Sequence, residues 1–424
     1  MGIMSFGTRV FWANHGKSTM NPSTHSHRNA RILAVCQALY ICAISIDLTL
    51  TGLTGYELAP DKSLATLPFA MITVSGAGVS YFAAFLLQWL GRRLGFTLGA
   101  LIGAVGGGIS VWAVMEGRFW LFCAGTAGVG VYQAFALYYR LAAADAVEPE
   151  AKSRAISTVL AGGVLAAIIG PALAAWSKDL IPSALFAGAY LMVALLGVIA
   201  AGLLWTFYCD GDPITAGGVA SMDDAGPRPL GVIVRQPVFA ASMANNVIGS
   251  VTMLFVMTAA PLAAVSCHHS IDDGANIIQW HLVGMYAPSL VTGWLIRRVG
   301  LLSLLVAGGV LNVVCVVAAV SSTSLPAFYV ALFALGVGWN FMFVGGSTLQ
   351  AQSYRPSERA KTQGVSEFLR YATTAGATLA AGPVLQHYGW STVNLAILPL
   401  LLVATVLTLW WGRAERLKKE PLPA

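Results

Sequence analysis

Charged residues are scarce in this chain, and their scarcity excludes an ordinary soluble protein. Asp, Glu, Lys and Arg together make up 10% of the 424 residues, whereas 57% are hydrophobic and the mean hydropathy is +0.72. A soluble domain carries about 25% charged residues. The few charges separate apolar runs of about 20 residues, and a helix of that length crosses a hydrocarbon layer of about 30 Å. We therefore expect a membrane protein.

Cysteine pairs, metal-ligand clusters and nucleotide-binding loops are also missing from the sequence. The six cysteines are scattered, and Cys267, which is expected in an extracytoplasmic connector, has no partner there, so no disulfide framework is expected. Gly16-Lys17-Ser18 resembles the end of a phosphate-binding loop, but Phe11 stands where the first glycine is required. Without metal-ligand spacing or a Ser–His–Asp set, we expect no cofactor, no bound metal and no enzymatic activity.

The apolar runs predict an all-α membrane protein, because lipid offers no hydrogen-bond partner to an open backbone group. Twelve transmembrane helices are expected. Their ranges are near 32–55, 64–89, 94–115, 118–141, 154–176, 183–208, 236–264, 275–296, 300–320, 326–350, 361–386 and 389–411.

The positive charges predict the orientation of these spans. In the odd-numbered connectors the basic residues are Lys62, Arg118 and Lys178, whereas the even-numbered connectors and the tails hold most of the others. Lys and Arg mark the cytoplasmic side, so both termini are expected in the cytoplasm and the spans in the cell inner membrane. The pI near 9.0 is then explained by the basic residues of the cytoplasmic connectors and tails. No nucleic-acid partner is expected, because these charges do not cluster on one folded face.

A connector rich in Gly, Pro and Asp divides the spans six and six, and the sequence repeats across it. Gln88–Gly95 aligns with Gly293–Gly300 at an offset of 205 residues, and Lys152–Ser157 aligns with Lys361–Ser366 at an offset of 209. The predicted organisation is a tail at 1–31, a six-helix half at 32–208, a linker at 209–235, a second six-helix half at 236–412 and a tail at 413–424.

These features resemble the major facilitator superfamily, including its G-x-L-x-D-R-x-G turn. Gly293, Leu295, Arg298 and Gly300 fit the second copy, with Arg297 in the acidic place. In the first copy Leu90, Arg93 and Gly95 fit, whereas Gln88 and Arg92 replace Gly and Asp. The resemblance implies a cytoplasmic gating motif rebuilt with Asp145 or Glu358. Its expected members are Arg92, Arg93, Gly95, Asp145, Arg297, Arg298 and Gly300.

The resemblance also implies two pseudo-symmetric six-helix halves that alternate access to a site between them near the midplane. It implies a monomer in contact with membrane lipid that carries a small-molecule substrate. The stretch from Gly162 to Gly170-Pro171 resembles the superfamily's antiporter signature but is incomplete, with Ala166 in place of a glycine.

Asp47 is the deepest charge of the first span, and such charges cost about 2.5–3.5 kcal/mol at the centre of a membrane helix. With Gln37, Tyr40, Ile44, Thr51 and Thr54 it forms one stripe of the helix. The stripe is expected to face the central cavity, where Asp47 would bind a proton or substrate. The alternative is a structural carboxylate bonded to neighbouring helices.

Glu367 and Arg370 lie three residues apart in the eleventh span and are therefore adjacent on its surface. Arg370 would hold an anionic group of the substrate while Glu367 exchanges a proton or releases Arg370. The alternative is a gating ion pair that never touches substrate.

Other polar residues in the spans predict a ligand with rings and hydrogen-bonding edges, although each alone is explained by contacts between helices. For Arg140, snorkelling or pairing with Asp145 is the alternative. The remaining candidates are Gln133, Asn245, Asn246, Gln279, Trp280, His281 and Asn340.

The sequence as a whole predicts a proton-coupled secondary active transporter of a small organic solute. A drug or metabolite exporter of the same fold and a transport-inactive membrane sensor are the alternatives.

Overall fold

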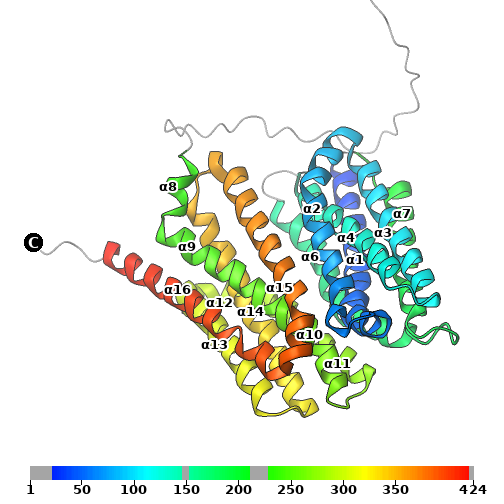
Figure 1. Ribbon diagram of the computed structural model, residues 1–424. Coiled ribbons are helices and arrows are strands. Elements are labelled where there is room, and N and C mark those ends of the chain that lie inside the picture. Colours follow the sequence, from blue (N-terminus) through cyan, green and yellow to red (C-terminus); the bar gives the residue numbers. More distant parts are fainter. Residues whose placement is uncertain (1–21, 146–151, 211–227, 420–424) are drawn as a thin grey trace, which may run out of the picture.

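The computed structural model describes residues 22–145, 152–210 and 228–419, which form two helical bundles side by side (Figure 1). The first bundle contains α1 (Pro22–Leu58), α2 (Leu67–Leu90), α3 (Arg92–Met115), α4 (Phe119–Ala136), α5 (Tyr139–Asp145), α6 (Lys152–Ser177), α7 (Ala187–Phe207) and the 3-10 helix η1 (Lys62–Leu64). The second contains α8 (Leu230–Val234), α9 (Pro237–Met243), the π-helical turn η3 (Ala244–Ile248), α10 (Gly249–Ser266), α11 (Ile271–Tyr286), α12 (Ser289–Val299), α13 (Leu301–Ser321), α14 (Leu325–Ser353), η4 (Pro356–Glu358), α15 (Arg359–Leu395) and α16 (Leu398–Lys419).

Each bundle has its own apolar core. In the N-terminal half, Phe122 packs edge-on against Tyr190 with ring centroids 4.9 Å apart, and both side chains are fully buried. In the C-terminal half, Phe328 stacks on Trp390 at 5.2 Å. Small residues allow close helix contacts: a Cβ added at Gly106 of α3 would lie 2.5 Å from the Gly125 carbonyl oxygen of α4.

Helices occupy the ranges in which spans were predicted, but the number of helical segments and their continuity differ from the prediction. Within the described residues, nine helical segments are long and apolar enough to cross a membrane, and one of them, Lys361–Leu417, joins two predicted spans across a kink at Gly389. The predicted eighth span is interrupted at Pro288, between α11 and α12, because proline lacks the N–H that would continue the helix. The all-α membrane fold is confirmed, while the count of twelve spans remains a prediction.

The structure corrects the register of the first internal repeat. Gly91 separates α2 from α3 with φ +82°, and Gly300 separates α12 from α13 with φ +86°, so these two glycines are equivalent, at an offset of 209 residues. Only glycine adopts this backbone conformation without strain. Gly95, which was aligned with Gly300, instead lies inside α3, where its missing side chain makes room for Leu87.

The basic residues of the connectors gather at one end of the bundles, which we call the basic end. It carries Arg92, Arg93, Arg228, Arg235, Arg297, Arg298, Arg355, Arg359 and Arg413. The two halves meet at the opposite end. There the Gly382 N–H of α15 donates to the Thr66 hydroxyl at 3.0 Å, and Gly52 of α1 faces Leu262 of α10.

Candidate functional site

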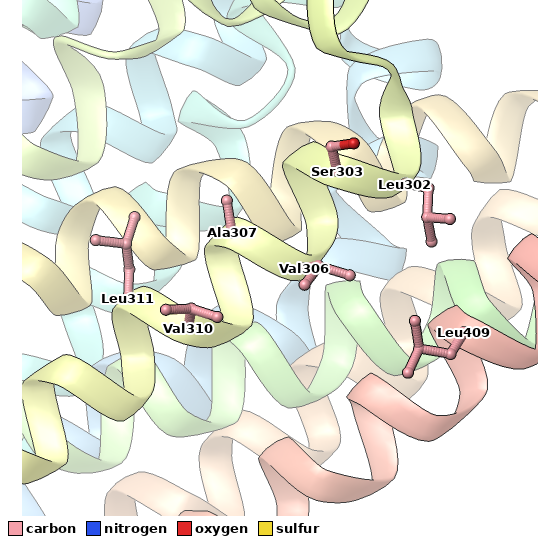
Figure 2. A pocket seen from close by; sticks show the side chains of 7 residues that line it. All are labelled: Leu302, Ser303, Val306, Ala307, Val310, Leu311 and Leu409. Atoms are coloured by element: carbon pink, nitrogen blue, oxygen red, sulfur yellow. The ribbon is translucent and has the colours of Figure 1, made fainter.

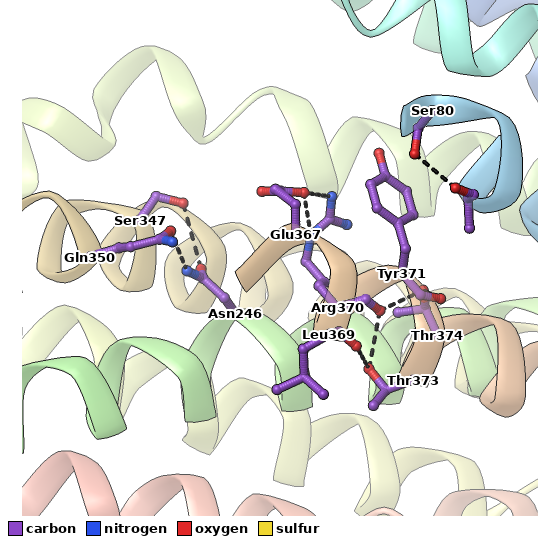
Figure 3. A network of polar contacts seen from close by, with 11 residues as sticks. Ser80, Asn246, Ser347, Gln350, Glu367, Leu369, Arg370, Tyr371, Thr373 and Thr374 are labelled. Atoms are coloured by element: carbon purple, nitrogen blue, oxygen red, sulfur yellow. Dashed lines mark hydrogen bonds and ion pairs between the residues drawn. The ribbon is translucent and has the colours of Figure 1, made fainter. Parts of the chain in front are cut away.

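Arg370 of α15 is held by the Glu367 carboxylate and by two aromatic rings, one of which, Tyr371, is drawn with the ion pair in Figure 3. Its Nε donates to Glu367 Oε2 at 3.1 Å, and its terminal nitrogen bonds the same oxygen. The guanidinium lies 4.4 Å from the ring centroid of Tyr371 and 5.7 Å from that of Phe343. The Arg370 side chain is 17% exposed and that of Glu367 45%, so the carboxylate is the more open partner. The predicted adjacency of Glu367 and Arg370 is confirmed.

Aromatic rings of α14 and α15 lie against this pair. Phe343 stacks on Trp339, one turn earlier in α14, with centroids 4.8 Å apart and planes 11° apart. The indole N–H of Trp339 is buried and finds no acceptor among the described residues. In the N-terminal half, Tyr40 of α1 is buried and packs edge-on against Tyr132 of α4, with ring centroids 5.4 Å apart. We call Trp339, Phe343 and Tyr371 the ring cluster, and its flat surfaces can stack on a flat ligand.

A pair of buried amides lies next to this cluster in the C-terminal half (Figure 3). Asn246 belongs to η3, and π-helical turns of this kind are frequent at functional sites. Its Nδ2 reaches Gln350 Oε1 of α14 only at 3.5 Å, and its Oδ1 receives the Ser347 hydroxyl at 3.5 Å. Gln350 Nε2 is buried and has no acceptor in the described part of the chain. The two amides therefore keep hydrogen-bonding capacity that their own contacts do not use.

Asp47 is fully buried inside the N-terminal half. Its Oδ1 accepts from the Thr51 hydroxyl at 3.2 Å, whereas Oδ2 has no donor within the residues that the structure describes. Tyr190 of α7 donates toward Thr54 at 3.0 Å, which places this part of the stripe against α7. Tyr40, farther along the predicted stripe, is also buried and packs against Tyr132, so both residues pack inside the N-terminal half.

Asn340 and Asn245 join helices within the C-terminal half. Asn340 Nδ2 donates to the Met285 carbonyl at 2.7 Å and to the Ser289 hydroxyl at 2.6 Å, and so bridges α14 to the interruption between α11 and α12. Asn245 Nδ2 donates to Thr408 of α16 at 2.7 Å. Both amides turn toward neighbouring helices, so their hydrogen bonds stabilise the bundle.

His281 and Trp280 occupy opposite environments on α11. His281 is fully buried, with Nδ1 2.7 Å from the Leu332 carbonyl and Nε2 unpartnered among the described residues. Trp280 is 53% exposed and packs edge-on against Phe333, which is also exposed. These positions place the two residues apart from the ring cluster.

Three further candidates lie on other surfaces. Gln133 of α4 is half-buried, and its Oε1 finds no donor in the described ranges. Arg140 is exposed at the start of α5, and Gln279 is half-buried in α11. The side chain of Asp145, the expected partner of Arg140, lies outside the described residues.

At the basic end, Arg93 is bound by residues of its own half that lie at the end of α7 and just beyond it. The Asp210 carboxylate accepts from the Arg93 N–H at 2.9 Å, and Arg93 Nε donates to the Trp205 carbonyl at 2.8 Å. Arg92 donates to the Ala142 carbonyl at 3.4 Å. Asp210, which belongs to no sequence motif, thus supplies an acid next to the turn in which Arg92 replaces the motif's Asp.

Glu358 is buried and bound twice by Arg228, at 2.8 and 2.7 Å. It also accepts from the Arg228 and Arg355 backbone N–H groups, at 2.7 and 2.9 Å. The Arg228 hydrogen bonds are the main reason that the pKa of Glu358 falls to about 2. Glu358 therefore joins the linker to α15 within one half. Within the described residues, no group of three or more His, Cys, Asp and Glu side chains could hold a metal ion.

Comparisons with known proteins agree with this architecture. The sequence model of the Major Facilitator Superfamily matches residues 275–424. The chain is 40% identical to Riboflavin transporter RfnT of Brucella anthropi over 387 residues, 91% of this chain and 96% of that protein. It is 27% identical to the uncharacterized MFS-type transporter YddS of Bacillus subtilis, covering 91% of each.

Solved structures show the same fold. A mutant of the nucleoside transporter NupG superposes with a TM-score of 0.66 at 15% identity, covering 91% of this chain and 99% of that one. A bacterial homologue of the human lysosomal transporter Spinster, inward-facing and unoccupied, gives the same score and identity over 94% and 99%. The chain therefore belongs to the major facilitator superfamily and is a multi-pass membrane transporter.

Proposed function

We propose that this protein is a secondary active transporter of riboflavin, or of a closely related flavin, in the inner membrane. The observation that carries the proposal is the 40% identity to Riboflavin transporter RfnT across nearly the full length of both chains. The relative YddS from Bacillus subtilis has no named substrate and so does not compete with this choice.

The chemistry of the candidate site supports a flavin. Riboflavin presents a flat fused ring, an imide edge with an N–H between two carbonyl groups, and a hydroxylated side chain. The ring cluster offers stacking partners for the flat ring, and stacking on an aromatic side chain contributes about 1–3 kcal/mol per base in nucleic-acid sites. Asn246 and Gln350 offer the donor and acceptor groups that an imide edge requires.

Arg370 also suits a neutral substrate, because Glu367 already balances its charge. The guanidinium would donate to a flavin carbonyl without leaving the protein's own charge unpaired. This assigns substrate contact to Arg370 and Tyr371, and a supporting role to Glu367.

Alternating access and topology complete the proposal. The basic end is cytoplasmic by the positive-inside rule, and both termini lie on that side. The contacts between Thr66 and Gly382 then lie at the outer end, and their presence supports an inward-facing conformation here. A reporter fused after Ala424 or inserted near Ser221 should register as cytoplasmic, and a signal from the other side would contradict this topology.

The test of substrate is uptake of radiolabelled riboflavin by proteoliposomes that contain the purified protein. Riboflavin should accumulate above the signal of empty liposomes, and unlabelled riboflavin should compete, whereas uridine should not. Inhibition by uridine with none by riboflavin would overturn the choice of a flavin.

Proton coupling is assigned to Asp47, whose buried Oδ2 has no donor in the described part of the chain. The Asp47 carboxylate has one described donor, Thr51, for its two oxygens, and a poorly compensated charge inside a membrane protein is costly, so release and uptake of a proton at this group can accompany the conformational cycle. Asp47→Asn should abolish accumulation driven by a pH gradient while keeping exchange of labelled for unlabelled substrate. Unchanged accumulation at every pH would remove Asp47 from the mechanism.

A further inference from the structure

A groove of the C-terminal half is lined by residues of α13 and α16, none of which belongs to the candidate transport site (Figure 2). It runs along α13 from Leu302 to Leu311 and is closed on one side by Leu409 of α16. Its volume is about 700 Å³, within the range of roughly 300–1,000 Å³ typical of ligand sites. Apart from Ser303, the residues that line it are aliphatic.

The length of the groove matches one leaflet of a membrane. The helix from Leu302 to Leu311 rises about 13 Å at about 1.5 Å per residue. Half of a hydrocarbon core of about 30 Å is about 15 Å. The groove therefore has the reach of a single acyl chain that enters from one membrane surface.

Helix contacts fix the position of α16 along this groove. Gly412 of α16 lies directly against Leu302, because an added Cβ would come within 2.7 Å of its side chain. Farther along, Gly309 of α13 faces the Thr405 hydroxyl, 3.5 Å from such a Cβ. The end of the groove at Leu302 is thus the end from which the basic tail of α16 continues.

Arginines stand on both sides of that end. Arg413 follows Gly412 directly and Arg416 lies one turn farther, while Arg297 and Arg298 close α12 just before the Gly300 turn. All four are exposed, and Glu415 is the acidic residue among them. An exposed guanidinium group can bind a phosphate group through two parallel N–H···O hydrogen bonds.

Tryptophans beside the Leu302 end of the groove indicate that this end lies at the membrane interface. The Arg298 guanidinium lies 5.2 Å from the ring centroid of Trp294, and both Trp294 and Trp410 are half exposed. Tryptophan concentrates where headgroups meet the hydrocarbon core. The arginines are therefore at headgroup height, with the apolar groove directly below them.

We propose that this groove binds one anionic phospholipid of the surrounding leaflet, with an acyl chain along α13 and the phosphate held by the arginines of α12 and α16. Charge complementarity selects this occupant, because a zwitterionic lipid or an apolar protein surface gains less from the arginines than a lipid with net negative charge. The site does not depend on the transported solute.

The experiment uses the full-length protein in detergent, titrated with dioleoyl phosphatidylglycerol or dioleoyl phosphatidylcholine. Bound lipid is counted by native mass spectrometry, and the melting temperature is recorded in parallel. Phosphatidylglycerol should bind in a saturable, near one-to-one manner and raise the melting temperature, because a ligand of the folded state stabilises it. Phosphatidylcholine should bind about tenfold more weakly.

Two variants separate the headgroup contact from the groove. Arg413→Gln with Arg416→Gln should remove the preference for phosphatidylglycerol, whereas the matched control Arg118→Gln with Arg235→Gln keeps it. Ala307→Phe should fill the groove and weaken both lipids. Equal binding of the two lipids by the unmodified protein, or equal loss of preference in the control, would overturn the proposal.

Discussion

Lys178 Nζ of the N-terminal half lies 3.5 Å from Asp272 Oδ1 of the C-terminal half, at the end of the bundle opposite the basic residues. The ammonium also binds Asp179 at 2.5 Å, and this hydrogen bond is the largest contribution to the raised pKa of Lys178. The Lys178–Asp272 pair and the Thr66–Gly382 hydrogen bond both join the halves at this end. For a substrate to pass here, these contacts have to separate.

We predict that linking Lys178 to Asp272 stops transport. In a background where the less buried Cys209 and Cys267 are replaced by Ser, Lys178→Cys and Asp272→Cys are joined by a short, reducible thiol reagent. Riboflavin uptake should fall to the background level and return after reduction, because alternating access requires the outer ends to part. Each single-cysteine variant is the control. Full uptake by the cross-linked protein would show that these ends do not separate during the cycle.

Local patterns in the sequence predicted part of the site. The three-residue spacing of Glu367 and Arg370 fixes their adjacency on any helix, and the four-residue spacing of Asp47 and Thr51 does the same. Tyr371 directly follows Arg370 in α15, so its proximity could have been read from the sequence, whereas the contact of Phe343 with Arg370 depends on how α14 packs against α15. That packing has no signature in either segment alone.

The turns and the linker also escaped prediction from sequence. Trp-Leu and Arg-Arg recur at the same spacing in both repeat copies, so the alignment paired Gly95 with Gly300, whereas the backbone conformation identifies Gly91 as the equivalent of Gly300. Arg228 lies in a connector without hydrophobic periodicity, and its hydrogen bonds to Glu358 join residues 130 positions apart. Such distant pairs require the folded structure.

We predict that Tyr371 contributes to riboflavin affinity mainly through its ring and less through its hydroxyl group. Loss of one stacking partner costs about 1–3 kcal/mol, or roughly 5- to 150-fold in affinity. Tyr371→Ala should therefore raise the riboflavin KM by at least about fivefold, whereas Tyr371→Phe should change it by less than about twofold. Uptake kinetics provide the measurement, with Tyr388→Ala, an exposed tyrosine beyond the cluster, as the control. Equal effects of the Ala and Phe variants would argue against stacking.

The Glu358–Arg228 contact should stabilise the fold over the whole physiological pH range. The pKa of Glu358 is lowered from about 4.5 to about 2 by its Arg228 hydrogen bonds, so the stabilisation is present above about pH 4.5 and is lost as the pH falls toward 2. Glu358→Gln should lower the melting temperature by a constant amount between pH 5.5 and 8. That difference should shrink below about pH 4.5. A difference that changes between pH 6 and 8 would assign the effect to another group.

The Glu367–Arg370 pair leads to the last prediction, because the two partners are unequally exposed. Removing the carboxylate leaves the more buried guanidinium with two aromatic rings and no counter-charge, and an unpaired charge costs more than the loss of both partners. Glu367→Gln and Arg370→Gln should each impair expression or uptake, and the double variant should express better than the worse single variant. If Arg370 also contacts the substrate, the double variant will express and yet fail to bind riboflavin. Expression, binding and initial uptake are compared with those of Lys361→Gln, an exposed charge on the same helix. Strictly additive losses would mean that the ion pair has no role in either stability or transport.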